Sequence, residues 1–576
     1  MLRPAMKRPL PFIICLTGGL LLLGVAWLIP AHLRAVDIGV IRAAGANTDV
    51  LLSTGQALEG ARSLSSAQMF LRAAEIEQIG GGKGRGNLAI PINMDIHSRP
   101  AWLPLGGASP RLESVFGTSS ARYAPTNIPF TDFVLKLGNL DRALAFLNAS
   151  PNPVIKNLLL CRGLTNLAIF PPSQSSSGQA FDSALSICGL LVEEGTMTPA
   201  MTRVVSGLCS DALAGGGSEP LEQMLLDYLS LGQRFDWNQL QLFTARLEDA
   251  GTLRLLANAV RQSSGNESII FSAVVLSREP AAVGTYLSNF SKTGVADLGL
   301  SLGANAGGIR ELLHRNLRIE DSPLRGRLTR YEPFATFLEV ARDYCWRMPA
   351  MALILRWLFY LAAGFLLAAA MHFVLPAPPA LQRPLEVRGA NWAREFLFAL
   401  GFLLVVLLVS EPFLAQESQK AALPFRLHVP TSGAAVTAGE PGVKVSFMNP
   451  SNILTMLLFF VLQGLLYIAC LVKLSEIRRQ RVSSRMKLKL LENEDHLFDA
   501  GLYLGFLGTI VSFILFSLTI MPHFSLMVAY SSTSFGIVFV SLFKIFHLRP
   551  LRRQLLLEAD VEPTDPVAAR AAAVAA

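Results

Sequence analysis

Long apolar stretches alternate with mixed segments along this chain. Six of them approach the ~20 residues that an α-helix needs to cross the hydrocarbon core of a bilayer. We therefore expect about six membrane-spanning helices, at Pro11–Leu28, Trp357–Leu375, Phe396–Ser410, Ile453–Val472, Leu502–Ile520 and Leu526–Phe546. The pattern predicts an all-α, polytopic membrane protein.

Basic residues orient these predicted spans. Lys and Arg gather before the first span, between the second and third, after the fourth and after the sixth. The opposite short connections hold only Lys420, Arg426 and Lys444. Because positively charged connections stay in the cytoplasm, we expect both termini there and residues 31–350 outside. The predicted location is a bacterial inner membrane, with residues 1–30 as an uncleaved signal anchor.

The large outer segment has the pattern of a water-soluble helical domain. Residues 56–79 have helical spacing, the glycine cluster at 80–86 predicts a flexible loop, and residues 87–130 predict a surface connection. We therefore divide the segment into a helix and linker, 31–130, and a helical domain, 131–350.

Within 131–350, apolar residues recur at three- and four-residue spacings, and helix-start signals recur at Thr198, Ser218 and Asp236. Small residues between large ones resemble tetratricopeptide-type helix pairs, although the strict 34-residue pattern is absent. Such an array is either a platform for a periplasmic protein partner or a plain helical bundle without a ligand.

The remaining chain divides at the predicted spans. Residues 351–415 hold the second and third spans, and 453–548 hold the last three. Between them, 416–452 form a small outer loop with a possible hairpin, and 549–576 are expected to be a disordered cytoplasmic tail.

Composition adds little chemistry. Charged residues make up 16% of the chain, against about 25% in soluble domains, and the net charge of +8 comes from residues flanking apolar runs. We therefore expect membrane lipid, and no nucleic acid, as a partner. Of the six cysteines, Cys161, Cys188 and Cys209 lie in the outer segment, where buried thiols are favoured over a disulfide.

We expect no enzyme activity, cofactor or metal site. The eight histidines lack metal-ligand spacing, and Lys83 is followed by Gly84 instead of the Ser or Thr of a phosphate loop. Ser301, in the string GLSLG, lacks the strand that a nucleophile elbow needs and is expected in a loop. Glu411 ends the third span as an interfacial carboxylate, and Arg356 is expected to extend to the interface.

The last two predicted spans each carry a small, partly polar face. Its members are small or hydroxyl-bearing residues at mostly three- to four-residue spacing: Gly505, Gly508, Thr509, Ser512, Ser532, Thr533 and Gly536. Such a face allows close helix packing, with hydroxyls bonding across the contact. The alternative is an ion path at a subunit interface.

The runs LYLGFLGTIVSFILF, residues 502–516, and YSSTSFGIVFVSLFKIF, residues 530–546, resemble the MotA/TolQ/ExbB family of proton-channel stators. Thr509, Thr533 and Gly536 correspond to residues of that family's motifs. The resemblance implies a homo-oligomer and a single-span partner of the ExbD/TolR kind. A glutamate that family members carry before the last-span threonine is replaced here by about Val528.

Two functions follow as hypotheses. In the first, the C-terminal helices are an ion-channel stator module, coupled to an envelope process through the outer domain. In the second, the chain is a non-conducting, membrane-anchored scaffold for an envelope partner.

Overall fold

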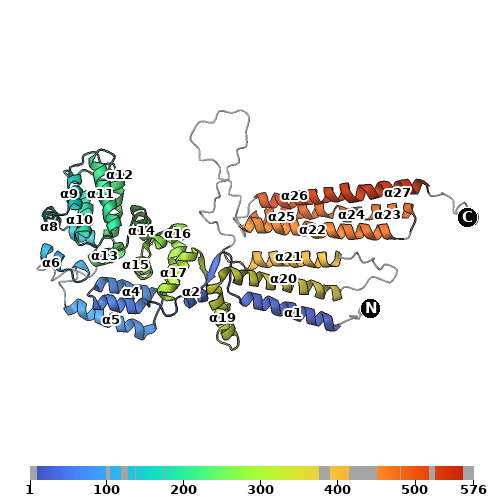
Figure 1. The fold of residues 1–576 in the computed structure, drawn as a ribbon, viewed down its shortest axis with the longest axis horizontal. Coiled ribbons are helices and arrows are strands. Elements are labelled where there is room, and N and C mark those ends of the chain that lie inside the picture. Colours follow the sequence, from blue (N-terminus) through green and yellow to red (C-terminus); the bar gives the residue numbers. More distant parts are fainter. Residues whose placement is uncertain are drawn as a thin grey trace, which may run out of the picture. The chain divides into compact units, whose positions relative to one another are not determined.

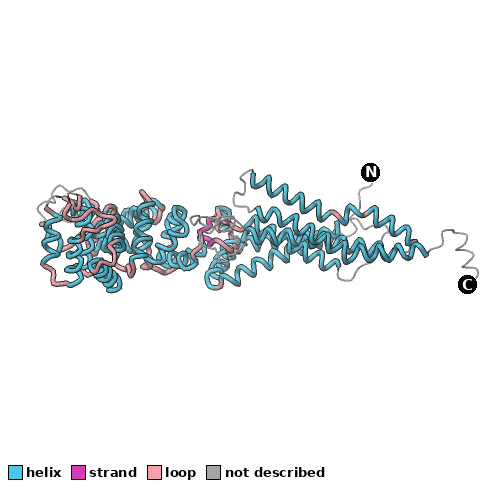
Figure 2. The backbone as a smooth tube through the Cα atoms, turned by 90° about the horizontal axis from the view of Figure 1, so that it is seen from above, coloured by secondary structure: helices cyan, strands magenta, loops and turns pink. Residues whose placement is uncertain are grey.

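The computed structural model describes residues 9–98, 104–117, 128–136, 138–175, 177–374, 390–413, 450–480, 482–517 and 526–561. The chain divides into two compact units (Figure 1). The membrane unit comprises Met1–Arg34 and Met348–Ala576, and the helical unit comprises Ala35–Arg347. Figure 2 shows that both are almost entirely helical, as expected for an all-α chain.

The membrane unit is built from apolar helices. They are α1 (Pro9–Leu28), α20 (Pro349–Val374), α21 (Ala390–Ser410), α22 (Pro450–Arg479), α25 (Ala500–Ser517) and α26 (Leu526–Phe543). Among the described residues, four helices are long and apolar enough to cross a membrane: Leu10–Leu28, Pro349–Met371, Asn452–Arg479 and Ala529–Asp560. Glu395–Ser410 and Ala500–Ile514 are shorter apolar helices, so the count of six spans stays a prediction.

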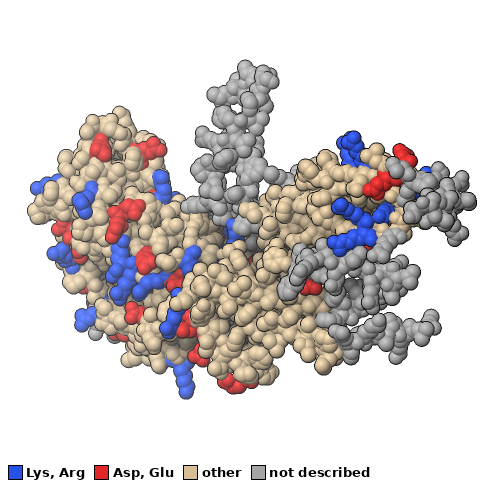
Figure 3. All heavy atoms as spheres, turned by 45° about the vertical axis from the view of Figure 1, so that its right-hand side comes forward, with Lys and Arg blue, Asp and Glu red and all other residues tan. Residues whose placement is uncertain are grey.

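These helices pack in sequence order within the membrane unit. α1 packs on α20, α20 on α21, and α21 on α22, while α22 and α25 pack on α26. Glycines allow the close approaches. For example, a Cβ on Gly364 of α20 would lie 3.1 Å from the Cα atom of Ala399 in α21. Figure 3 shows that Lys, Arg, Asp and Glu gather toward the end of this unit that holds the C-terminus.

The prediction of a disordered tail at 549–576 is wrong for its first part, which forms a helix. α27 (Arg549–Val561) continues from α26 through a π-helical turn, Lys544–Leu548. Leu551 and Leu555 are buried in one cluster with Leu491 of α23 (Ser484–Asn493). α27 is therefore held by an amphipathic face that packs on α23. The short helix α24 (Asp495–Phe498) completes this end.

The helical unit runs from α2 to α19. Its helices are α2 (Ile38–Ala44), α3 (Leu51–Gly60), α4 (Leu64–Ile76), α5 (Gly81–Ser98), α6 (Pro110–Phe116), α7 (Phe130–Val134), α8 (Asn139–Asn148), α9 (Pro153–Leu160), α10 (Gln179–Glu193), α11 (Pro199–Leu213), α12 (Glu219–Gly232), α13 (Trp237–Thr244), α14 (Ala250–Gln262), α15 (Glu267–Ser277), α16 (Pro280–Leu302), α17 (Asn305–Arg315), α18 (Pro323–Leu328) and α19 (Phe334–Arg347). A 3₁₀ turn, Cys161–Gly163, follows α9.

A small parallel sheet joins distant parts of the helical unit. β1 (Ala35–Asp37) pairs with β2 (Arg318–Glu320), with Val36 opposite Ile319. Arg325 fixes the pair because its guanidinium lies 2.7 Å from Asp37 Oδ2 and 2.9 Å from Glu320 Oε2. These strands were not predicted from the sequence, because they are only three residues long and leave no readable period.

Helices far apart in the chain also pack together, for example α4 on α15 and α2 on α17. In an open solenoid each repeat contacts only its neighbours. The contacts of α4 with α15 and of α2 with α17 instead join helices that are not neighbours in the sequence. Similarity to tetratricopeptide pairs therefore concerns the local packing of successive helices, such as α15 and α16, and stays a prediction.

Two of the predicted helix starts are capped as expected. Thr198 Oγ1 accepts a hydrogen bond from Met201 N, and Asp236 forms a capping box with Gln239. α12 also begins directly after Ser218, but the hydroxyl of Ser218 donates to Glu222 Oε1 at 2.7 Å instead of capping the helix.

The predicted hairpin at 416–452 lies outside the described residues, apart from the first turn of α22.

The division of the outer segment at residue 130 differs from the structure. The glycine cluster at 80–86 mostly belongs to α5, not to a loop, because Leu88 and Ile92 of this helix are buried against Ala67 of α4. The burial outweighs the low helix propensity of glycine. Residues 35–130 thus belong to the same compact unit as the rest of the outer segment.

Two candidate chemical features are part of the helical core. Ser301 lies in α16, not in a loop, and its buried hydroxyl donates to Leu298 O at 2.7 Å. Cys161, Cys188 and Cys209 are buried, and each is a free thiol in the structure. Burial raises the pKa of Cys188 to about 12, so its thiol stays protonated and unreactive.

Candidate functional site

The predicted small polar face forms the contact between α25 and α26. Thr509 Oγ1 lies 2.6 Å from Thr533 Oγ1 and 2.9 Å from Ala529 O. Ser512 Oγ donates to Gly508 O of its own helix at 2.7 Å. Each of these hydroxyls therefore has a partner within the hairpin.

The glycines of this face bring the two backbones together. A Cβ on Gly505 would lie 2.8 Å from Ser532 O, and one on Gly536 would lie 2.6 Å from Gly501 O. A Cβ on Gly508 would meet the hydroxyl of Ser532, which is itself buried. The structure thus brings six residues of the predicted face to one tight helix contact of the small-xxx-small kind, whereas the hydroxyl of Ser512 bonds only within α25.

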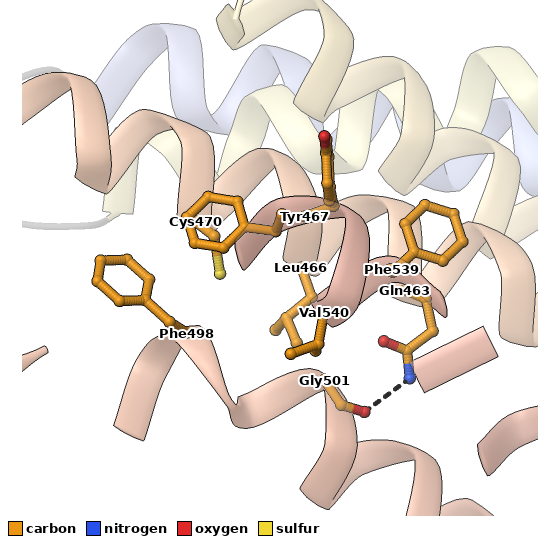
Figure 4. A pocket seen from close by; sticks show the side chains of 9 residues that line it. Gln463, Leu466, Tyr467, Cys470, Phe498, Gly501, Phe539 and Val540 are labelled. Atoms are coloured by element: carbon orange, nitrogen blue, oxygen red, sulfur yellow. Dashed lines mark hydrogen bonds between the residues drawn. The ribbon is translucent and has the colours of Figure 1, made fainter. Parts of the chain in front are cut away.

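A third helix completes the contact with an amide that sequence reasoning missed. Gln463 of α22 is buried, and its Nε2 donates to Gly501 O at 3.1 Å (Figure 4). Its Oε1 has no protein partner among the described residues. It lies beside a small cavity of about 10 Å³, roughly the space of one water molecule. Apolar and sulfur-containing side chains of α22 and α26 form most of the lining, including Leu466, Tyr467, Cys470, Phe539, Val540 and Phe543.

A second cluster in the membrane unit joins the end of α1 to α20 and α21. Arg356 Nη1 lies 3.1 Å from Glu411 Oε1 and 2.9 Å from His32 Nδ1, and it also donates to Ala31 O. The other carboxylate oxygen of Glu411 accepts from Leu33 N at 2.8 Å. The side chains of Arg356, Glu411 and His32 are each at most 1% exposed.

The guanidinium of Arg356 lies at the centre of this cluster. A guanidinium is always charged and can only donate, so His32 Nδ1 accepts from Arg356 when the imidazole is neutral. Glu411 then neutralises Arg356 as a carboxylate. The aromatic ring of Tyr360 makes a cation–π contact with Arg356, whose guanidinium Cζ lies 5.4 Å from the ring centroid. The cluster is a closed ion pair that ties three segments together.

No protein-family model matches the chain, and no curated protein or solved structure does either.

The burial of Glu411 and Arg356 differs from the sequence prediction. Glu411 and Arg356 are buried within the protein, so Arg356 does not extend to the surface, and the interfacial depth of Glu411 stays a prediction. The predicted orientation of the spans is the sequence signal that indicates a common depth for these residues. In the predicted orientation, the end of the first span, the start of the second and the end of the third all face outward. His32, Arg356 and Glu411 therefore occupy the same depth, where opposite charges pair.

Within the described ranges, no three His, Cys, Asp or Glu side chains group closely enough to hold a metal ion. The two clusters of the membrane unit therefore offer packing, hydrogen bonding and charge neutralisation. Neither places a nucleophile beside a base.

Proposed function

We propose that this chain is a membrane-anchored scaffold. Its apolar helices hold it in a bacterial inner membrane, and the helical unit Ala35–Arg347 binds a protein partner of the cell envelope outside the cytoplasm. The uneven distribution of Lys and Arg beside the apolar helices supports this orientation. The size of the helical unit and its own buried core support its role as a binding domain.

One observation carries the choice of scaffold over channel: the hydroxyls between α25 and α26 are satisfied within the chain. Thr509 and Thr533 bond to each other and to backbone carbonyls. An ion path would need these oxygens to face water or an ion. The backbone approach at Gly505 leaves no such space between the two helices.

The stator module suggested by the MotA/TolQ/ExbB resemblance is the competing proposal. It requires a homo-oligomer with a path between copies, and a single-span partner. It also requires a group that carries protons. Glu411 is a poor candidate for that group because Arg356 already neutralises it.

Proton flux through the purified, full-length chain tests the scaffold. We expect proteoliposomes to dissipate an imposed pH gradient no faster than empty vesicles, for the wild type and for Thr533→Val. The substitution keeps the volume of the side chain and removes one hydroxyl. Interhelical hydrogen bonds in membranes average about 0.6 kcal/mol, so oligomer yield in mild detergent should stay unchanged.

A proton flux in the wild type that Thr509→Val and Thr533→Val both abolish, with intact oligomers, would overturn the scaffold in favour of the channel.

The orientation of the chain in the membrane has its own test, with a reporter that is active only in the cytoplasm. Fusions after Lys489 should be active and fusions after Gly265 silent. Activity after Gly265 would remove the outer binding domain from the proposal.

A further inference from the structure

Helix α19, the last helix of the helical unit, has two apolar sides. Leu338 and Cys345 are buried on one side, where α19 packs on α2. Phe337, Val340 and Tyr344 lie on another side and are 38%, 66% and 37% exposed. Their spacing of three and four residues places them in one stripe along the helix. Aromatic rings in such a stripe are costly to leave in water.

Another side of α19 is mostly polar, with Trp346 exposed beside the charged residues. This side carries Thr336, Glu339, Asp343 and Arg347. Arg347 Nε lies 3.0 Å from Asp343 Oδ2. Arg315 of α17 donates to Cys345 O and Trp346 O at 3.3 Å, so the end of α19 is fixed to the helical unit. One polar face and one apolar face are typical of helices that lie in the interface of a membrane.

The chain itself links this stripe to the bilayer. α19 ends at Arg347 and α20, a candidate membrane span, begins at Pro349. Two residues of chain reach at most about 7 Å, so the end of α19 lies within that reach of the first residue of α20. The exposed apolar positions also continue along the sequence, through Met348 and Met351 to Ile354.

We propose that α19 lies in the headgroup region of the outer leaflet, with Phe337, Val340 and Tyr344 inserted among the lipids. The exposed residues of α20 face lipid because that helix spans the bilayer. Lipid binding by α19 would fix the helical unit at the membrane surface. The inference rests on the membrane anchoring in the proposed function.

Photo-crosslinking of the full chain tests this inference. A benzophenone-bearing phenylalanine analogue replaces one residue at a time, and the protein is reconstituted in vesicles of phosphatidylethanolamine and phosphatidylglycerol. After illumination, mass spectrometry detects phospholipid adducts. We expect adducts at Val340, and only background at Glu339, the adjacent exposed residue on the polar side of α19.

Ile354 of α20 distinguishes failure of the interfacial position of α19 from failure of the membrane anchor. Adducts at Ile354 without adducts at Val340 would overturn the interfacial helix and leave the anchor intact. Adducts at neither position would overturn both. A cross-linked dimer at Val340 in place of lipid adducts would also overturn the inference, because a second copy of the chain would then cover the stripe.

Discussion

Arg356 and Glu411 lie at the ends of apolar helices, where sequence reasoning places charged side chains in the headgroup region. The structure buries both in one ion pair with His32. A buried pair is costly to desolvate, but removing one partner leaves the other charge without compensation. The pair therefore acts mainly by fixing α1, α20 and α21 in one arrangement.

We predict that Arg356→Met and Glu411→Gln each destabilise the chain by about 3–5 kcal/mol, the usual result of breaking a buried pair. The double variant should cost less than the sum of the two. The midpoint of unfolding by sodium dodecyl sulfate in mixed micelles measures these changes. Glu492→Gln is the control, because Glu492 pairs with Arg552 at an exposed site, where a pair contributes at most about 1 kcal/mol. Additive effects of the two core substitutions would contradict the pairing.

Asp236 is the buried carboxyl at the start of α13. Its Oδ1 accepts from Ser65 Oγ and from Gln239 N, each at 2.9 Å. Burial raises the pKa of the Asp236 carboxyl to about 7, whereas an unfolded chain has an Asp pKa of about 3.9. Between these values the folded state holds a proton that the unfolded state releases. Stability is therefore fully present at low pH and falls as the pH rises toward 7.

We predict that the melting temperature of the helical unit, followed in the full chain in mild detergent, falls between about pH 4 and 7. Asp236→Asn should flatten this dependence, because Asn caps helices as well as Asp does and carries no charge. Asp249→Asn is the matched control. Asp249 caps α14, but hydrogen bonds, chiefly from Thr252, lower its pKa, so its stabilisation is lost only as the pH falls through the acidic range. An unchanged pH profile in Asp236→Asn would show that another group titrates.

At the scale of elements, the α25–α26 hairpin depends on glycines that only the facing backbone explains. Gly505 packs directly against the backbone of Ser532 and Thr533. Gly464, in the neighbouring helix α22, has open space around its Cα atom, since a Cβ there would meet nothing within 4 Å. The two positions look alike in the sequence and differ in what they contact.

We predict that Gly505→Ala destabilises the membrane unit, because the added methyl group would force α25 away from α26. Gly464→Ala should be neutral or stabilising, since Ala is favoured over Gly inside a helix by about 1 kcal/mol. The same unfolding assay in mixed micelles compares them. Equal midpoints for the two variants would contradict close packing at Gly505.

At the scale of the whole molecule, the helical unit depends on residues before 131. Ser65 and Ser66 of α4 bond to Asp236 and Asn238, each at 2.9 Å. Phe70 of α4 packs edge-on against Phe271 of α15, with ring centroids 6.2 Å apart. The core is therefore shared between the two parts into which the sequence pattern divides the outer segment.

We predict that residues 35–347, expressed alone, give a helical circular-dichroism spectrum and a cooperative melt. Residues 131–347 should lose the cooperative transition or melt at a markedly lower temperature, because removal of α4 uncovers Phe271 and leaves Asp236 without Ser65. Equal melting temperatures for the two fragments would show that the core does not need α4.

The sequence alone determined the helical class, the positions of the apolar helices and the small face of the C-terminal hairpin. These features follow from local signals: hydrophobic runs, helix period and residue size. Helix starts at Thr198 and Asp236 were readable for the same reason, since a cap involves only the next few residues.

Tertiary structure alone decided the rest. Whether Gly81 to Ser98 forms a helix depended on the core that Leu88 enters, and whether residues after 549 are ordered depended on α23. The predicted orientation indicates a common depth for Arg356 and Glu411, but their contact, between residues 55 positions apart, depends on how α20 packs on α21. Local patterns carry no information about which distant surface an element meets, and that meeting sets burial, charge pairing and the boundary of each unit.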